Sequence, residues 1–277
     1  MRYYLTSLLL IAAITACKPQ KDNSSNVKDK SSSQQTEQED IIILPGNEFG
    51  SQDQTQQKHT EMNKTIRVHY GESFQYHEYR VGLQDGRWLE EIAGLVTRIF
   101  NLNADLQLTT DDCEEKNAFY SPSEKKITFC YEMMHWIWEL FRYAPGTYLS
   151  KEEVWEQTMN TVLVIMMHEF GHAFIDIFDP PMTGKEEDVA DQISSLFFLG
   201  FKDREAEGVV LSAAAFWLLD SVVGSSEYPV YWGRHSLNEQ RFYNLSCWVY
   251  GSDPHYYRTA ISEDHLPESR KSGLLPN

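Results

Sequence analysis

Positively charged residues are scarce in this chain of 277 residues. It contains 24 Lys and Arg against 41 Asp and Glu, which gives a formal net charge of -17 at pH 7. An acidic surface repels the phosphates of nucleic acids, so we expect no nucleic-acid partner. The sequence also lacks a glycine-rich phosphate-binding loop and any internal repeat. Neither P-loop nucleotide binding nor a repeat architecture is therefore indicated.

Cysteine is also rare, with four residues and no closely spaced pair, which argues against a zinc-cysteine site. Cys113 and Cys130 flank a predicted hairpin, and they could close it covalently in an oxidising compartment. Pairing of Cys130 with Cys247 is the alternative, and the sequence does not decide between the two.

The first 17 residues contain an export signal. Arg2 precedes an apolar core at 5–13 and then Cys17, a pattern typical of a bacterial lipoprotein signal peptide spanning residues 1–16. The apolar core is too short to span a bilayer. We expect cleavage before Cys17, acylation of that cysteine and a lipid anchor in the membrane. An ordinary secretory signal is the alternative, and either signal exports the protein. Because Lys18 is not a retention-type Asp, resemblance to sorted lipoproteins favours the outer membrane, facing the periplasm.

Composition divides the remainder into two parts. Residues 17–63 are rich in Ser, Gln and charged side chains, so they cannot bury enough apolar surface to offset the entropy lost on ordering. We expect a solvated tether, interrupted by one apolar island at 41–45. Residues 64–277 are long enough for one catalytic domain with a substantial core.

A metal-binding motif, His168-Glu169-x-x-His172, stands in the middle of this domain. Two histidines four apart on a helix point at one metal ion, and the Glu stands beside the open coordination position. Zinc held by three protein ligands keeps a position for water and lowers its pKa. The apolar run at 161–167 predicts a buried helix, which begins with a capping box at Ser150. The alternative is a pair of core histidines satisfied by hydrogen bonds.

A third ligand follows the motif. The helix is expected to stop near 179–181, and a second helix begins within 184–191. Glu187 and Asp191 lie four apart and share a face of that helix. We assign Glu187 to the metal and Asp191 to the ring N–H of a ligand histidine, whose orientation it would fix. The alternative is that these acidic residues only favour a helix N-terminus.

Hydrophobic periodicity predicts a sheet first and helices after it. Strands are expected at 65–70, 106–108, 118–120 and 126–129, and helices at 86–101, 150–178, 185–199, 203–220 and from 235 onward. The fold class is therefore α+β, with an N-terminal mixed sheet, a mainly helical C-terminal half and the active-site helix between them.

The metal motif followed by Glu187-x-x-Ala190-Asp191 resembles the gluzincin arrangement of thermolysin and neprilysin. In those enzymes the later Glu is the third zinc ligand and the Asp steadies a zinc histidine. The resemblance implies a zincin-like fold and one zinc ion per chain. One departure is the short spacing, since His172 and Glu187 are only fifteen residues apart.

Two further segments resemble neprilysin. Asn117-Ala118-Phe119-Tyr120 is similar to the edge strand whose Asn and Ala hydrogen-bond the substrate backbone, which implies that role for Asn117 and Ala118. His235 and Arg241 lie in a segment similar to the one that holds the transition-state histidine and the substrate-carbonyl arginine. Without the resemblance, Asn117 would be a strand-end residue and His235 a structural or exposed side chain. Tyr231 is a second candidate donor.

Because these segments depart from neprilysin, the resemblance does not predict which side chains form the specificity pocket. Arg234 precedes His235, whereas neprilysin has an acidic residue two positions before, and Cys130 occupies the position of a proline. The chain as a whole is similar to a bacterial family described as putative metallopeptidases. That family carries in the same order the segments found here at 117–120, 130–132, 168–172 and 240–244, and the similarity spans about 68–276.

We therefore expect a zinc metallopeptidase of the cell envelope that acts on peptide or protein substrates. Glu169 would serve as the general base, and His235 would stabilise the tetrahedral intermediate. Two alternatives stay open: an inactive envelope lipoprotein that works as a binding or scaffold module, and a zinc amidase that cleaves cell-wall cross-links. The sequence does not indicate the oligomeric state.

Overall fold

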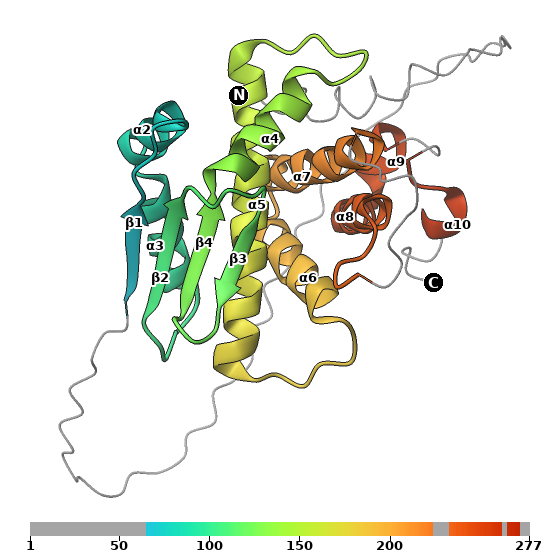
Figure 1. Ribbon diagram of the computed structural model, residues 1–277. Coiled ribbons are helices and arrows are strands. Elements are labelled where there is room, and N and C mark those ends of the chain that lie inside the picture. The colour runs from blue at the N-terminus through green and yellow to red at the C-terminus, as the bar shows by residue number, and fades with distance from the viewer. Residues whose placement is uncertain (1–64, 224–232, 262–264, 272–277) are drawn as a thin grey trace, which may run out of the picture. The chain divides into compact units, whose positions relative to one another are not determined.

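The computed structural model describes residues 65–223, 233–261 and 265–271 (Figure 1). The predicted signal peptide, Cys17, the tether and Tyr231 lie outside these residues. A small mixed sheet is followed by a mostly helical remainder, which confirms the predicted α+β class. The elements in order are β1 (Ile66–Tyr70), α2 (His77–Asp85), α3 (Trp88–Ile99), β2 (Leu106–Asp111), β3 (Ala118–Ser121), β4 (Lys126–Cys130), α4 (Tyr131–Arg142), α5 (Lys151–Phe178), α6 (Glu186–Leu199), α7 (Arg204–Val223), α8 (Asn238–Ser252), α9 (Pro254–Ala260) and α10 (Glu268–Lys271).

The sheet has the order β1-β2-β4-β3. Strands β1, β2 and β4 are parallel, whereas β3 runs antiparallel to β4 and lies at the edge. The central strands β2 and β4 are buried at most positions, as expected for strands with neighbours on both sides. The predicted hairpin and its edge strand are therefore present in the structure.

Helix α5 organises the rest of the molecule. It begins at a capping box, in which the Ser150 hydroxyl accepts from the N–H of Glu153 and the Glu153 carboxylate accepts from the N–H of Ser150. It ends where Asp179 adopts a left-handed conformation (φ 45°) before two prolines. Most of its residues are buried, because β3, β4, α4, α6 and α7 all pack against it. The metal motif therefore lies on the most enclosed helix of the described fold.

The helices differ from the predictions in two respects. The predicted helix at 86–101 is α3, whereas α2 and α4 were not predicted. The predicted helix start at His235 is wrong by three residues, because α8 begins at Asn238. His235 therefore lies on the loop that leads into α8.

Candidate functional site

Three side chains converge where α5 meets α6. The Nε2 atoms of His168 and His172 lie 3.2 Å apart, and each lies 3.2 Å from Oε2 of Glu187. Ligand atoms about 2.05 Å from a tetrahedral zinc ion are themselves separated by about 3.3 Å. The triangle therefore has the size that such an ion requires, and the donor set of two imidazoles and one carboxylate is one that zinc accepts.

The other nitrogen of each ring faces a carboxylate. His168 Nδ1 lies 2.8 Å from Asp191, and His172 Nδ1 lies 2.7 Å from Glu186. An ionised carboxylate can only accept, so each neutral ring carries its proton on Nδ1 and directs the lone pair of Nε2 at the shared point. Two nitrogen lone pairs and a carboxylate oxygen that face one point repel one another unless a cation lies between them. Glu186 was not singled out from the sequence, since sequence spacing gives no sign of its contact with His172.

Asp191 joins the metal site to α8. Arg241 Nε donates to one oxygen of Asp191 at 2.9 Å, and its Nη2 donates to the other at 2.6 Å. The guanidinium also lies 3.6 Å from the centre of the Trp217 ring. Burial alone would raise the pKa of Asp191, but Arg241 and His168 hold it well below its usual range. Asp191 is therefore an ionised acceptor, fixed in place for the ring of His168.

Protons compensate the charge of the metal-free site. Burial would lower the pKa of His168, but its hydrogen bonds with Asp191 and Glu187 outweigh burial and raise the pKa to about 9. Burial would likewise raise the pKa of Glu187, but hydrogen bonds with His168, His172 and His235 hold it well below the ordinary range. These shifts show that the site favours positive charge. Protons and a metal ion would compete for the same imidazole nitrogens and carboxylate oxygen.

A glycine allows the two helices to approach. A Cβ atom built on Gly171 would lie 3.0 Å from Cα and 3.2 Å from Cβ of Ala190 on α6. Only a residue without a side chain fits at this crossing without moving α6. Gly171 lies between Glu169 and His172, so the close approach sets the separation between the histidines and Glu187.

A cleft opens beside this cluster. It has a volume of about 430 Å³ and is lined by His168, Glu169, His235 and Arg241, and by Asn117 and Ala118 at the start of the edge strand. The structure therefore brings the predicted catalytic residues and the predicted substrate-binding residues to one cavity. Glu169 is buried, which raises its pKa, and its neighbours His168 and His172 oppose this effect.

His235 reaches the cluster from the loop before α8. Its Nε2 lies 2.9 Å from Oε2 of Glu187, and the side chain is 54% exposed. A carboxylate accepts at this distance, so the ring can donate through Nε2. Arg234 also approaches Glu187, at 3.6 Å, and is largely exposed. Both side chains lie at the solvent-facing side of the site, where a substrate would enter.

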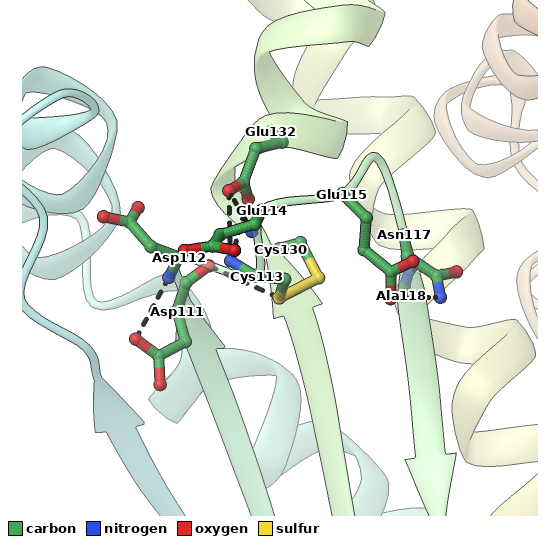
Figure 2. The surroundings of a disulfide bond; sticks show 9 residues. All are labelled: Asp111, Asp112, Cys113, Glu114, Glu115, Asn117, Ala118, Cys130 and Glu132. Carbon is green, nitrogen blue, oxygen red and sulfur yellow. Dashed lines mark hydrogen bonds between the residues drawn. A yellow bond between two sulfur atoms is a disulfide. The ribbon is translucent and has the colours of Figure 1, made fainter.

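The loop that carries Asn117 is held by the predicted disulfide between Cys113 and Cys130 (Figure 2). The carboxylate of Glu132 accepts from the backbone N–H groups of Cys113 and Glu114, and the N–H of Cys130 donates to the carbonyl of Asn117. The alternative pairing is wrong, because Cys247 is a buried free cysteine. The start of the edge strand is thus tied to the first turn of α4.

Sequence reasoning missed the far wall of the cleft, which comes from α4, α7 and α8. Lys116 Nζ lies 3.5 Å from the centre of the Trp136 ring. Trp136 Nε1 and Asn238 Nδ2 each donate to Asp220, both at 2.7 Å. Nothing in the spacing of these residues signals that α4, α7 and α8 meet at the cleft, so only the fold reveals this wall.

Comparison with known proteins gives one family. Searches of curated proteins and of solved structures found no match. A protein-family model described as putative metallopeptidase matches residues 68–273, which include β2, β3, β4, most of β1, the metal-binding cluster and the residues that line the cleft. A family named for metal-dependent peptide hydrolysis agrees with a site where two histidines and a carboxylate could hold a metal beside a buried glutamate. On this match over most of its length, the chain belongs to the putative metallopeptidase family.

Proposed function

We propose that this protein is a zinc-dependent metallopeptidase with a gluzincin-like site. The observation that carries the proposal is the triangle of 3.2 Å contacts among His168, His172 and Glu187, at the edge of a cleft that Glu169 also lines. A zinc ion held by these residues would polarise the scissile carbonyl and lower the pKa of the attacking water. The zincin-like arrangement is supported by the position of the motif helix beside an edge strand.

Glu169 would serve as the general base. It follows His168 directly on α5, and its carboxylate lines the cleft at the metal-binding cluster. Burial raises the pKa of Glu169, although His168 and His172 oppose this effect, and a raised pKa makes a carboxylate a stronger base. It would take the proton from the attacking water and deliver it to the leaving amine.

His235 would stabilise the developing oxyanion. Its ring lines the cleft, and its Nε2 lies 2.9 Å from Oε2 of Glu187, close enough to the metal-binding cluster to donate to an oxyanion formed there. An N–H donor at that position is worth roughly 3–4 kcal/mol of transition-state stabilisation when it is well oriented. Arg241 supports the proposal differently, because its guanidinium is engaged with Asp191 and would position the metal ligand His168.

The substrate would lie along β3. An extended peptide can add to an exposed edge strand through main-chain hydrogen bonds, which gives affinity without requiring particular side chains. Asn117 and Ala118 would be the contacts nearest to the scissile bond, since both line the cleft with Glu169. We further propose that the enzyme is exported and lipid-anchored at Cys17, so that its peptide or protein substrates are in the cell envelope.

The test is the substitution Glu169→Gln in the purified soluble domain. We expect about one zinc per chain in both the wild type and the variant, and a loss of peptide cleavage by at least about 100-fold in the variant. Glu239→Gln, an exposed residue outside the cleft that makes the same change in charge, should leave cleavage unchanged. Cleavage that persists in Glu169→Gln, or a wild type that takes up no zinc, would contradict the proposal.

A further inference from the structure

A second cavity lies away from the catalytic cleft. Its volume is about 830 Å³, roughly twice that of the cleft. Its lining comes from α2 and the segment leading into it, from α4, and from the start of α5. These elements lie at the end of the sheet where the parallel strands finish (Figure 1). None of its lining residues belongs to the metal-binding cluster. A cavity of this size matches those that bind small molecules or short polymers.

Aromatic rings form the walls of this cavity. Tyr76, Tyr79, His135, Trp138 and Trp155 all line it, and each is only partly buried. The rings of Tyr79 and Trp155 are within 8° of parallel, with centroids 6.3 Å apart, and Tyr76 lies at 28° to Tyr79. His135 is tilted by 43° to Tyr76 and by 50° to Tyr79, so the rings line the cavity at several angles. Aromatic walls of this kind can pack against the apolar faces of a ligand made of rings.

Polar groups within the walls remain able to bond a ligand. Burial raises the pKa of Tyr79 to about 12, so its hydroxyl keeps its proton and can donate to His135 Nδ1 at 3.0 Å. The ring of His135 has a second nitrogen, Nε2, that can bond a ligand as a donor or as an acceptor according to its tautomer. The hydroxyl of Tyr76 accepts from Gln75 at 3.1 Å, which leaves its own proton for another acceptor.

The rim carries charges of both signs. Glu78 lies on one side, and Arg142 and Lys151 lie on the other, all of them exposed, together with the neutral amide of Gln75. A binding site for an ionic ligand usually carries only charges of the opposite sign. This rim instead offers strong hydrogen-bond donors, Arg142 and Lys151, together with a strong acceptor, Glu78. A ligand with many hydroxyl groups, each able to donate and to accept, uses both kinds.

We propose that this cavity binds a short chain of neutral pyranose sugars. A pyranose ring has apolar C–H faces that pack on aromatic rings, and hydroxyl groups at its edge that would reach the rim. A purely apolar ligand would strip water from the wall and rim polar groups without replacing their hydrogen bonds. The cavity is large enough for several such rings in a row.

The test is calorimetric titration of the zinc-loaded full domain with two probes, the β-1,4-linked tetramers of N-acetylglucosamine and of glucose. We expect at least one to bind with a Kd of about 1 mM or tighter. Binding should also change tryptophan fluorescence, because Trp138 and Trp155 line the cavity. Binding of both tetramers indicates recognition of pyranose chains in general, and binding of the acetylated tetramer alone indicates an amino-sugar chain.

Two variants locate the site. Arg142→Gln removes an exposed rim donor and Trp155→Phe reduces the ring surface, so each should weaken the affinity by at least about five-fold. Arg258→Gln, an exposed arginine elsewhere, is the matched control and should bind as the wild type does. All three variants should keep zinc and peptide cleavage, so that this proposal and the proposed function can fail separately.

Three outcomes would overturn the proposal. Neither tetramer binds at about 10 mM; or both binding variants retain the wild-type affinity; or an aromatic dipeptide binds in the cavity while the sugars do not. Because Arg142 is exposed, its substitution gives an answer even if Trp155→Phe does not fold.

Discussion

Arg241 determines how the ring of His168, a proposed metal ligand, can be oriented. Its guanidinium bonds both oxygens of Asp191, and the face of Trp217 prevents it from moving aside. Asp191 is thereby unable to rotate, and its contact with Nδ1 keeps the ring of His168 in one orientation. The sequence resemblance implied a direct contact between Arg241 and substrate. The geometry instead supports a positioning role, with the guanidinium still at the wall of the cleft.

The raised pKa of His168 predicts how pH changes the effect of metal removal. In the metal-free protein this pKa rises from 6.5 to about 9, because hydrogen bonds with Asp191 and Glu187 outweigh burial. A histidine whose pKa is raised by folding stabilises the folded state in its protonated form. This stabilisation is complete below about pH 6.5, and it is lost as the pH rises through about 9. Metal binding requires the deprotonated ring. Metal removal should therefore destabilise the protein more at pH 9 than at pH 6.

Thermal melts of zinc-loaded and metal-free protein at the two pH values measure this effect. A shift of this size corresponds to roughly 3 kcal/mol, or roughly 5–10 °C in the difference between the two melting temperatures. Glu187→Gln, which lacks a proposed ligand, should show no effect of zinc at either pH. An effect of zinc that is equal at both pH values, or larger at pH 6, would show that His168 does not titrate as described.

At the residue scale, the sequence pointed to side chains whose spacing carries chemistry. His168, Glu169 and His172 form a local pattern, and Glu187 and Asp191 share one helix face, so their convergence needed only two helices to meet. Residues such as Trp217 and Asp220 could not be predicted, because their place depends on how α7 packs on α5 and α8. Long-range packing leaves no periodic trace in the sequence.

At the scale of elements, the crossing of α5 and α6 depends on Gly171. Alanine is favoured over glycine within a helix by about 1 kcal/mol, but its Cβ would press on the backbone of Ala190. Helix α6 must then shift by a few tenths of an ångström and carry Glu187 with it. We expect Gly171→Ala to fold and to bind zinc about 10-fold more weakly, measured by competition with a chelating dye.

Gly208→Ala is the matched control for this substitution. Gly208 also lies within a helix, α7, and a Cβ atom added there meets no atom within 4 Å. The control should gain up to about 1 kcal/mol in the free energy of unfolding and keep the zinc affinity of the wild type. If both variants bind zinc as the wild type does, the close approach of the helices does not set the geometry of the site.

The disulfide acts on the edge strand as well as on stability. Cys113 and Cys130 are 17 residues apart, and a closed loop of that length contributes about 3 kcal/mol to the free energy of unfolding. The same bond holds the loop that leads to Asn117. The double substitution Cys113→Ser and Cys130→Ser should therefore lower the melting temperature and raise KM for peptide cleavage by several-fold, with kcat nearly unchanged.

Reducing agent should reproduce both effects in the wild type. Cys247→Ala, which removes the free cysteine, should respond to the reductant as the wild type does. A fall in kcat with KM unchanged would contradict the positioning role of the loop.

Element boundaries were predictable wherever a local signal exists. The capping box at Ser150 and the prolines after Asp179 mark both ends of α5, and the hairpin of β3 and β4 follows from alternation around a turn. Helix α2 was missed because its apolar residues form a weak pattern, with Leu83 as its one buried residue. The start of α8 was misplaced because Leu237, the residue at its N-cap, is not one of the polar residues that mark a helix start in a sequence.

At the scale of the whole molecule, two helices among the residues that the structure describes are long and apolar enough to cross a membrane. They are α5 and α7, and 72% and 61% of their most apolar stretches are buried within the fold. Both pack in the core around the metal-binding cluster, which explains their composition without a bilayer. The sequence predicts a different attachment to the membrane, an acylated Cys17.

Substitution of that cysteine tests the location. A single Cys17→Ser change should prevent acylation, because the thiol is the attachment point for lipid, and it should move the protein from the membrane fraction to the soluble periplasmic fraction. Fractionation of cells that incorporate a radioactive fatty acid measures both events. Cleavage by the released protein should equal that of the wild type, since residues 64–277 would contain the whole catalytic site. Wild-type protein found in the cytoplasm, or a variant that stays with the membrane, would mean that the signal at 1–16 has been misread.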